Sequence, residues 1–341
     1  MFLNSILINS IIISISLFGT LACNNSNEIT GKNNSVESTI VEKHGQLSIN
    51  GTNILDKNGN IFVLRGMSLF WSQWGGNYYN EQTIKWLRDN WKCTVIRVAM
   101  GVENGGYLDN PNEEFQKVIS VIDACIKFDI YVIIDWHDHH AENHINEAIS
   151  FFHNISLKYG NIPNIIYELY NEPLAVSWNN VIKPYTQTVT NTIRKNDSDN
   201  IILVGTPNWS QDVDNIINNK INDKNLAYVF HFYSSTHKLE LRNKAITAIN
   251  AGIPIFVSEW GLSEASGDGN INLVESKLWT DFFELYNLSW CNWSIMNKDE
   301  TSAALLPSTE SKSGWSESQL SQSGKIIRNY LIKENSSLFM K

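Results

Sequence analysis

Short apolar runs alternate along most of the chain with stretches in which apolar residues recur at helical spacing. The runs are rich in β-branched and aromatic residues, which favours strands, and the intervening stretches keep the spacing of one buried helix face. The eight predicted strands are residues 61–67, 94–99, 130–135, 164–170, 201–204, 226–231, 255–258 and 289–293. The predicted helices between them include residues 114–128, 145–159, 178–195, 238–251 and 274–288.

This alternation predicts an α/β fold. Strands that alternate with helices form a parallel sheet, and eight units in about 290 residues fit a (β/α)8 TIM barrel better than an open doubly wound sheet. Neither a Gly-x-Gly-x-x-Gly sequence nor a P-loop follows the first strand, which argues against a nucleotide-binding fold. Residues 47–52 and 54–60 form two short extended pieces with Gly and Asn turns, so we expect a short N-terminal β-hairpin before the barrel.

The predicted domain boundaries follow from changes in composition. We expect the barrel to occupy residues 45–333, preceded by a flexible Asn- and Ser-rich tether at 23–44 and followed by a frayed tail at 334–341. Residues 6–21 are almost wholly apolar, which is typical of a signal peptide covering residues 1–22. Cys23 follows Leu21 and Ala22 as in a bacterial lipoprotein, so lipidation of Cys23 and simple cleavage both stay open. Either outcome predicts export, to the medium, the periplasm or the cell surface.

Composition and charge narrow the ligand class. The 341 residues carry a formal net charge of -9, which argues against nucleic acid, since its recognition depends on clustered Lys and Arg. The twelve tryptophans supply either core residues or flat apolar platforms for sugar rings. Cys93, Cys125 and Cys291 lie apart in apolar segments, so we expect buried free thiols, although one disulfide among them stays open.

Polar or aromatic residues stand at seven of the eight predicted strand ends, where a TIM barrel carries its active site. They are Arg65 and Ser68, Arg97, Asp135 to His137, Asn171 and Glu172, His231 to Tyr233, Glu259 and Trp260, and Trp293. Hydrolysis of a glycosidic bond needs a proton donor and a second carboxylate, and Glu172 and Glu259 would face each other across the barrel mouth. A separation of about 5 Å would predict retention of configuration, and about 7–9 Å inversion.

The ordered motifs resemble glycoside hydrolase family 5. They are Arg97, Asp135-Trp-His137, Asn171-Glu-Pro173, His231-Phe-Tyr233 and Ser258-Glu-Trp-Gly261. The segments 66–74, 105–109 and 293–305 resemble its bacterial endoglucanase branch, and the resemblance spans about residues 45–330. It implies a cellulase that cuts internal β-1,4-glucosidic bonds of cellulose or related β-glucans by retaining double displacement.

The resemblance also implies roles for individual residues. Glu172 is the expected acid/base and Glu259 the expected nucleophile, which Arg97 and the phenol of Tyr233 would keep ionised. Asn171 would bind the sugar 2-hydroxyl, and His137 and His231 would orient the substrate and the acid/base. Trp293 would lie beneath the sugar at the cleavage point, with Trp74 on the glycone side and Trp209 on the aglycone side, and Lys298 and Glu300 would contact hydroxyls further along the glycone chain. Phe70 and Gly101 replace a His and a Tyr of some family members, so the contacts of those side chains are absent.

Other interpretations stay open. The same machinery could act on mannan, xyloglucan or mixed-linkage β-glucan, because loop side chains set specificity. A protein of another class, a surface lipoprotein that binds glucan without cutting it, would keep the tryptophans but lose a carboxylate. The histidine-rich segment 137–144 lacks the order of a zincin site and no ligand set is evident, so we expect no metal and no cofactor. We expect a monomer acting on soluble or amorphous glucan, with membrane contact only through a lipid at Cys23.

Overall fold

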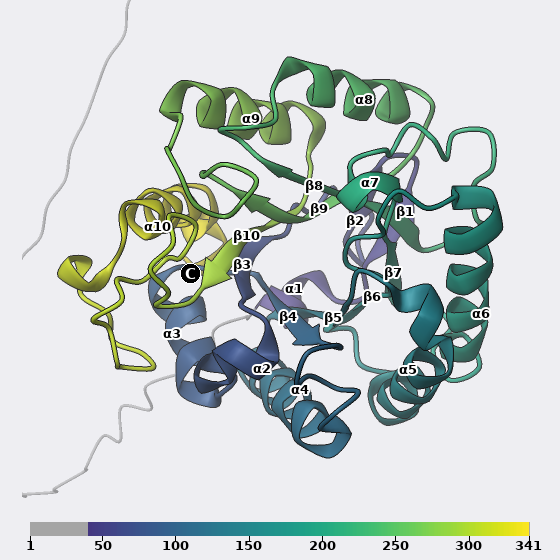
Figure 1. Ribbon diagram of the computed structural model, residues 1–341, viewed down its shortest axis with the longest axis horizontal. Coiled ribbons are helices and arrows are strands. Elements are labelled where there is room, and N and C mark those ends of the chain that lie inside the picture. Colours follow the sequence, from purple (N-terminus) through teal and green to yellow (C-terminus); the bar gives the residue numbers. More distant parts are fainter. Residues whose placement is uncertain (1–39, 341) are drawn as a thin grey trace, which may run out of the picture. The chain divides into compact units, whose positions relative to one another are not determined.

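The computed structural model describes residues 40–340 of the chain. Eight parallel strands close into a barrel in the order β10-β3-β4-β5-β6-β7-β8-β9, and helices surround it (Figure 1). The strands are β3 (Arg65–Leu69), β4 (Val95–Gly101), β5 (Tyr131–His137), β6 (Ile165–Glu168), β7 (Ile201–Val204), β8 (Leu226–Tyr233), β9 (Ile255–Gly261) and β10 (Trp290–Ile295). The predicted TIM barrel is confirmed.

The barrel strands are buried on both faces. Every residue of β4, β5, β6, β7, β9 and β10 is buried, which explains why these segments read as continuous apolar runs rather than as alternating ones. The neighbours β4 and β5 pair in register from Val95 with Tyr131 to Gly101 with His137. This register brings the carboxyl ends of the two strands to one rim of the barrel.

The outer helices bury one face each. They are α2 (Ser72–Gly75), α3 (Glu81–Asn90), α4 (Pro111–Lys127), α5 (Ile145–Tyr159), α6 (Lys183–Ile193), α7 (Pro207–Ser210), α8 (Leu239–Asn250), α9 (Leu273–Tyr286) and α10 (Gln322–Asn335). In α5, for example, Phe151 and Phe152 are buried and both contact the ring of Trp136 on β5. A π-helical turn, Trp178–Ile182, precedes α6, so the single helix predicted over residues 178–195 is divided.

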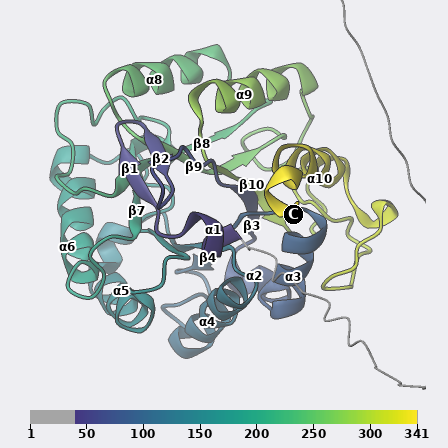
Figure 2. The same cartoon turned by 180° about the vertical axis from the view of Figure 1, so that it is seen from behind.

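The predicted N-terminal hairpin lies at the amino ends of the barrel strands. Its strands β1 (Ser48–Asn50) and β2 (Asn53–Leu55) pair antiparallel, and in the reverse view they lie in front of the barrel, beside β7 and β8 (Figure 2). Ile49 N–H donates to Asn225 Oδ1 just before β8, and Gln46 Nε2 donates to Asn200 Oδ1 just before β7. The hairpin therefore closes the end opposite to the expected active site.

The folded domain begins earlier than predicted. Residues Ile40–His44 form the helix α1 rather than the end of a tether, and Ile40 and Val41 are buried. The His44 ring stacks on Phe62 with centroids 3.9 Å apart. Helix α1 was not predicted because a single helical turn with two apolar residues has the same sequence pattern as part of a polar linker. The predicted signal peptide, Cys23 and the rest of the tether lie outside the described residues.

The C-terminal end is also more ordered than the predicted frayed tail. Helix α10 runs through Asn335 and a 3-10 turn, Ser336–Phe339, follows it. Asn335 is buried, and its Nδ2 donates to the carbonyls of Arg65 (3.2 Å) and Lys92 (2.8 Å). The buried amide of Asn335 therefore ties the end of this helix to the barrel.

Cys93, Cys125 and Cys291 are buried free thiols, as predicted, and none of the three is in a disulfide. No helix within residues 40–340 combines the length and the apolar character needed to cross a membrane.

Candidate active site

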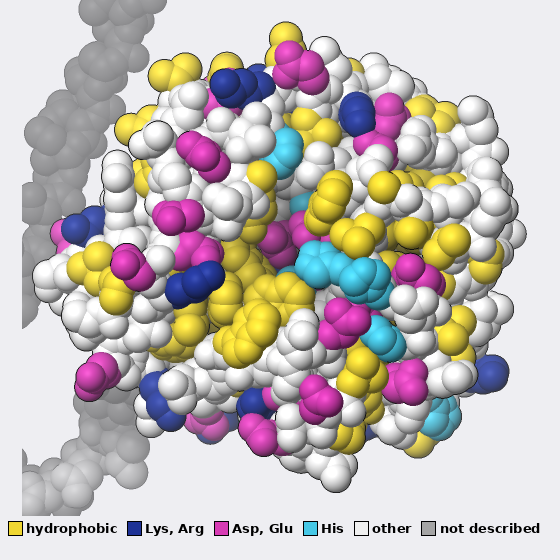
Figure 3. Space-filling view, in the orientation of Figure 1, with side chains coloured by type: hydrophobic (Ala, Val, Ile, Leu, Met, Phe, Trp, Pro, Cys, Tyr) yellow, Lys and Arg dark blue, Asp and Glu magenta, His cyan; other side chains and the backbone are white. Residues whose placement is uncertain are grey.

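A cleft of about 550 Å³ opens at the carboxyl ends of the barrel strands. In the space-filling view, apolar side chains form a hollow that histidines and carboxylates border (Figure 3). Eleven of the twelve predicted site residues line it, namely Glu172, Glu259, His137, Asn171, His231, Tyr233, Trp293, Trp74, Trp209, Lys298 and Glu300. The twelfth, Arg97, is buried and contacts Glu259.

Arg97 on β4 organises the buried charges beneath the cleft. Its guanidinium pairs with Glu168 (Nε to Oε2, 2.8 Å), with Asp135 (Nη2 to Oδ2, 2.9 Å) and with Glu259 (Nη1 to Oε2, 2.9 Å). Burial alone would lower the pKa of Arg97, but the three carboxyl groups outweigh it and raise that pKa. Burial raises the pKa of Asp135 to about 8 and that of Glu168 to about 7, against the opposing effect of Arg97. The buried cluster therefore contains one positively charged side chain, Arg97, and three carboxyl groups that pair with it.

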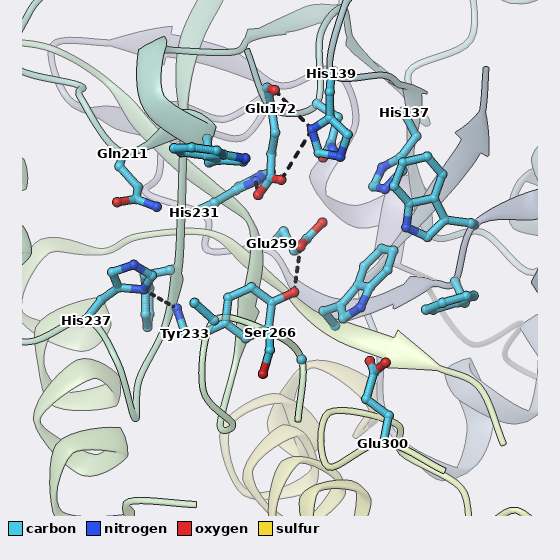
Figure 4. A pocket seen from close by; sticks show the side chains of 18 of the residues that line it. His137, His139, Glu172, Gln211, His231, Tyr233, His237, Glu259, Ser266 and Glu300 are labelled. Carbon is cyan, nitrogen blue, oxygen red and sulfur yellow. Dashed lines mark hydrogen bonds and ion pairs between the residues drawn. The ribbon is translucent and has the colours of Figure 1, made fainter. Parts of the chain in front are cut away.

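Glu259 on β9 accepts a hydrogen bond at each oxygen. Arg97 Nη1 donates to Oε2, and the hydroxyl of Tyr233 donates to Oε1 at 2.8 Å (Figure 4). Burial, followed by the charge of Glu259, raises the pKa of Tyr233, so its phenol keeps the hydrogen that it donates. Two such donors stabilise a carboxylate, which is the form that a nucleophile needs.

Glu172 follows β6 and meets the opposite environment. Its Oε1 lies 3.1 Å from His231 Nδ1, and its Oε2 lies 3.7 Å from His139 Nδ1. Burial raises the pKa of Glu172 well above its usual range, and the negative charge of Glu259 raises it further, while Arg97 opposes both. Burial also lowers the pKa of His231 well below its usual range, with the charge of Arg97 adding to the effect. The neutral imidazole gives no positive charge to ionise Glu172, which favours the protonated form that a general acid needs.

The two carboxyl groups lie close together across the cleft. One oxygen of Glu172 and one of Glu259 lie within 4.8 Å of each other and of a ring nitrogen of His231. A direct attack on the sugar needs carboxyl groups about 5–5.5 Å apart, whereas an intervening water needs about 6.5–9.5 Å. The observed spacing falls on the short, direct-attack side of these two ranges.

Asn171 and His137 are held by the same buried network. Asn171 Oδ1 accepts from Arg97 Nη2 at 2.7 Å, so its amide NH2 group is left to donate into the cleft. His137 Nδ1 lies 2.6 Å from Asp135 Oδ2, and burial lowers the pKa of His137 well below its usual range. Nδ1 is the ring nitrogen that contacts Asp135, so Nε2 is the one that remains for a ligand.

Aromatic side chains form the apolar walls of the cleft. The indole of Trp293 stacks on His137, with centroids 5.2 Å apart and planes 4° apart, and it also packs on Phe70. Trp74 and Trp209 are 53% and 47% exposed, which leaves large flat surfaces open to a ligand. Trp209 lies in α7, where Asn208, Trp209 and Ser210 all have a φ of 56°, a rare conformation for residues with side chains and one that recurs at functional sites. Lys298 and Glu300 form an ion pair at the rim.

Several cleft residues were not predicted. Trp71, His139, Gln211, His237 and Ser266 also line it. His139 lies in the histidine-rich segment after β5, and Trp71 follows Phe70 after β3, so their places at strand ends could have indicated them. Glu168 escaped notice because it ends a buried apolar strand, where only its charge is unusual.

The histidine-rich segment 137–144 forms a hydrogen-bonded loop. Asp138 accepts from the backbone N–H of His140 (2.8 Å) and from Trp136 Nε1 (3.3 Å), and its Oδ2 lies 2.7 Å from His144 Nδ1. Within residues 40–340, two sets of three donor side chains lie within 4.8 Å, namely Glu103 with Asp138 and His140, and Glu172 with His231 and Glu259. In each set, one carboxylate also has hydrogen-bond donors within the protein, namely the His140 N–H for Asp138 and Arg97 and Tyr233 for Glu259.

Comparisons with known proteins agree with this geometry. The family model for cellulase (glycosyl hydrolase family 5) matches residues 55–299. Endoglucanase A of Evansella cellulosilytica is 46% identical over 82% of this chain, and endoglucanase Z of Dickeya dadantii is 44% identical over 94%. The chain spans 58% of the length of the first relative and 71% of the second.

Solved structures share the fold and much of the sequence. A structure from Cytophaga hutchinsonii is 51% identical, with a TM-score of 0.87, and the match covers 88% of this chain and 99% of that chain. The catalytic domain of Thermobifida fusca endoglucanase Cel5A, in a variant solved in complex with cellotetraose, is 31% identical with a TM-score of 0.83, covering 86% of this chain and 99% of that chain. By the family model and by these identities, the chain belongs to glycosyl hydrolase family 5, the cellulase family.

Proposed function

We propose that this protein is a retaining endo-β-1,4-glucanase in which Glu172 is the acid/base and Glu259 the nucleophile. The observation that carries the proposal is the short separation, within 4.8 Å, between one carboxyl that has two hydrogen-bond donors and another whose pKa burial raises. Two carboxyl groups at this distance with opposite protonation preferences are what double displacement requires.

In the first step, a Glu259 oxygen attacks the anomeric carbon while the bond from that carbon to the leaving oxygen breaks. Glu172 transfers its proton to the leaving oxygen, and a covalent glycosyl ester forms on Glu259. In the second step, a water attacks the same carbon, Glu172 takes a proton from that water, and the Glu259 carboxylate leaves. The charges balance because Glu172 loses one proton in the first step and regains one in the second.

The remaining cleft residues support binding of a glucan chain. The Asn171 amide would donate to the 2-hydroxyl of the reacting sugar, a contact that strengthens at the transition state. Trp293 would support that sugar, with Trp74 on the glycone side and Trp209 on the aglycone side, and Lys298 and Glu300 would bind hydroxyls of the glycone. An open cleft with exposed tryptophans at two positions supports cutting within a chain rather than at its end.

The substrate assignment rests on similarity. Relatives that are 44–46% identical are named endoglucanases, and a related domain was solved with cellotetraose. This supports cellulose, carboxymethylcellulose and cellooligosaccharides as substrates, with mannan, xyloglucan and mixed-linkage β-glucan as the alternatives. Export, with or without a lipid at Cys23, and a monomeric state complete the proposal.

The test is reducing-sugar release from carboxymethylcellulose, mannan and mixed-linkage β-glucan by the wild type and by E259A. Preference for carboxymethylcellulose that E259A abolishes would support both the substrate and the nucleophile. Preference for another polymer would keep the mechanism and change the substrate. A folded wild type that is inactive on all three would overturn the proposal and favour a glucan-binding protein.

A further inference from the structure

A second group of metal-ligating side chains lies beside the cleft, beyond the ends of β4 and β5. Pairing of Gly101 with His137 brings the loop after β4 next to the loop after β5. Glu103 lies in the first loop, and His140 and His144 lie at the two ends of a short 3-10 turn in the second. The residues that line the cleft do not include these three.

Both histidines face the carboxyl group of Glu103. His140 Nδ1 lies 3.5 Å from Oε2, and His144 Nε2 lies 3.8 Å from Oε1. Both distances exceed the usual N–H···O hydrogen-bond range of about 2.7–3.2 Å. Donor atoms around a tetrahedral Zn²⁺ lie roughly 3.4 Å apart, because each metal–ligand bond is about 2.0–2.2 Å long. The two contacts therefore have the spacing of metal ligands rather than that of hydrogen-bond partners.

Asp138 orients one of the two histidines. Its buried side chain accepts from the backbone N–H of His140 at Oδ1 (2.8 Å) and from Trp136 Nε1 at Oδ2 (3.3 Å), and Oδ2 lies 2.7 Å from His144 Nδ1. Two such donors favour the carboxylate, which can only accept, so the hydrogen of the third contact lies on Nδ1. His144 Nε2 then presents its lone pair toward Glu103. A metal-bound histidine typically has this arrangement, with a carboxylate on one ring nitrogen and the ion on the other.

The negative charges in this group have no permanent cation beside them. One oxygen of Glu103, one of Asp138 and a ring nitrogen of His140 lie within 4.8 Å of one another. In the part of the chain that the structure describes, both carboxyl groups form ion pairs with histidines only, and neither pairs with Lys or Arg. Two carboxylates this close repel each other, and a divalent cation would neutralise both.

We propose that Glu103, His140 and His144 bind a divalent transition-metal ion, with Asp138 behind His144 as the residue that orients it. Two imidazole nitrogens and a carboxylate suit Zn²⁺, whereas Ca²⁺ and Mg²⁺ prefer oxygen ligands alone. Glu103 and His140 are partly exposed, which gives the ion a route from solvent. The histidine-rich segment by itself does not supply this set, because Glu103 comes from the end of another strand.

The ion would join the loop after β4 to the loop that carries His139. His139 lies between two residues of the site and points the other way. It lines the cleft, and its Nδ1 lies 3.2 Å from the carbonyl oxygen of Glu172 (Figure 4). The site shares no ligand with the proposed catalytic pair, Glu172 and Glu259. Its role is therefore to clamp the two loops and to stabilise the fold.

The test measures binding of Zn²⁺ to the full chain, first treated with EDTA and then freed of it, by isothermal titration calorimetry and by thermal unfolding. We expect one site with a Kd of about 10 μM or lower. At a free Zn²⁺ concentration about 100 times Kd, the melting temperature should rise by about 3–6 °C. Ca²⁺ at the same concentration is the control ion and should change the melting temperature by less than about 1 °C.

Variants locate the ion. E103Q, H140Q and H144Q each remove one ligand, and each should weaken Zn²⁺ binding by at least about tenfold and remove the rise in melting temperature. H153Q is the matched control, because His153 is an exposed histidine of α5 outside the group, and it should bind Zn²⁺ as the wild type does.

Two results would overturn the site. One is a wild type that binds Zn²⁺ no more tightly than a Kd of about 100 μM. The other is Zn²⁺ binding of unchanged affinity in folded E103Q and H140Q, which would place the ion elsewhere, for example at Glu172, His231 and Glu259. A protein that binds Zn²⁺ as expected but hydrolyses no glucan would support the metal site and overturn the proposed function.

Discussion

A carboxyl oxygen of Glu172 lies within 4.8 Å of a carboxyl oxygen of Glu259, and the donors around the pair are divided unequally. Arg97 and Tyr233 both donate to Glu259, whereas Glu172 meets a neutral histidine. At an effective dielectric of about 20, two negative charges this close repel by roughly 3 kcal/mol, so one of the carboxyls keeps its proton. The unequal donors decide that the protonated one is Glu172.

The first prediction concerns E172Q and the leaving group. Without the acid, hydrolysis of a cellooligosaccharide, in which the leaving group is a sugar hydroxyl, should slow by about 10²–10⁴-fold. An aryl cellobioside with an acidic phenol needs no protonation, so its first step should stay within about tenfold of wild type. Burst kinetics on the two substrates would check this. An equal loss on both would contradict the acid role.

The second prediction concerns stability and pH. Burial raises the pKa of Glu172, so the native state binds more protons than the unfolded chain above the unfolded pKa of the group. Its contribution to stability is therefore complete at low pH and is lost as pH rises. Glutamine does not titrate, so the E172Q protein does not lose stability in this way as pH rises. Its free energy of unfolding should exceed that of wild type by on the order of 1 kcal/mol at pH 8 and should differ little from wild type near pH 4.

Urea unfolding at the two pH values would measure the difference. E310Q is the matched control, because Glu310 is exposed and its replacement should change stability little at either pH. An E172Q protein less stable than wild type at pH 8 would contradict a buried, protonated Glu172.

The third prediction concerns the exposed tryptophans. W74A and W209A should each raise KM for cellotetraose or longer chains about 5–10-fold with a smaller change in kcat, because the lost contact is present in both the bound substrate and the transition state. L285A removes another exposed apolar side chain, on α9, and serves as the control. If W74A and W209A leave KM at the L285A value, neither indole contacts the substrate.

The fourth prediction concerns helix α1. A chain that begins at Gly45 lacks Ile40 and Val41, which are 1% and 4% exposed. It should unfold with a free energy about 2–4 kcal/mol lower than a chain that begins at residue 38. Thermal unfolding of the two chains would measure this. Equal melting temperatures would show that α1 adds nothing to the barrel.

The sequence predicted the barrel well where elements were long or strongly patterned. The helix at 145–159 and the strand at 201–204 have the predicted bounds. Helix α3, in which Thr83, Ile84 and Leu87 are the buried residues, was not among the helices named from the sequence. The cleft residues were predictable since strand ends of a TIM barrel converge on one rim. The separation of Glu172 and Glu259 was not predictable, because it depends on how the barrel closes. The pairing of Arg97 with Glu168 was not predictable either, because it depends on which strands face each other inside the barrel.

The most direct test of the account is the configuration of the first product. ¹H NMR spectra of cellopentaose with wild-type enzyme, recorded within the first minutes, would resolve the α and β anomeric protons of the new reducing end before mutarotation mixes them. Double displacement by Glu259 and Glu172 predicts that the β anomer appears first and the α anomer only later. Initial release of the α anomer would mean that a water attacks the glycosidic carbon directly, and it would contradict the nucleophilic role of Glu259.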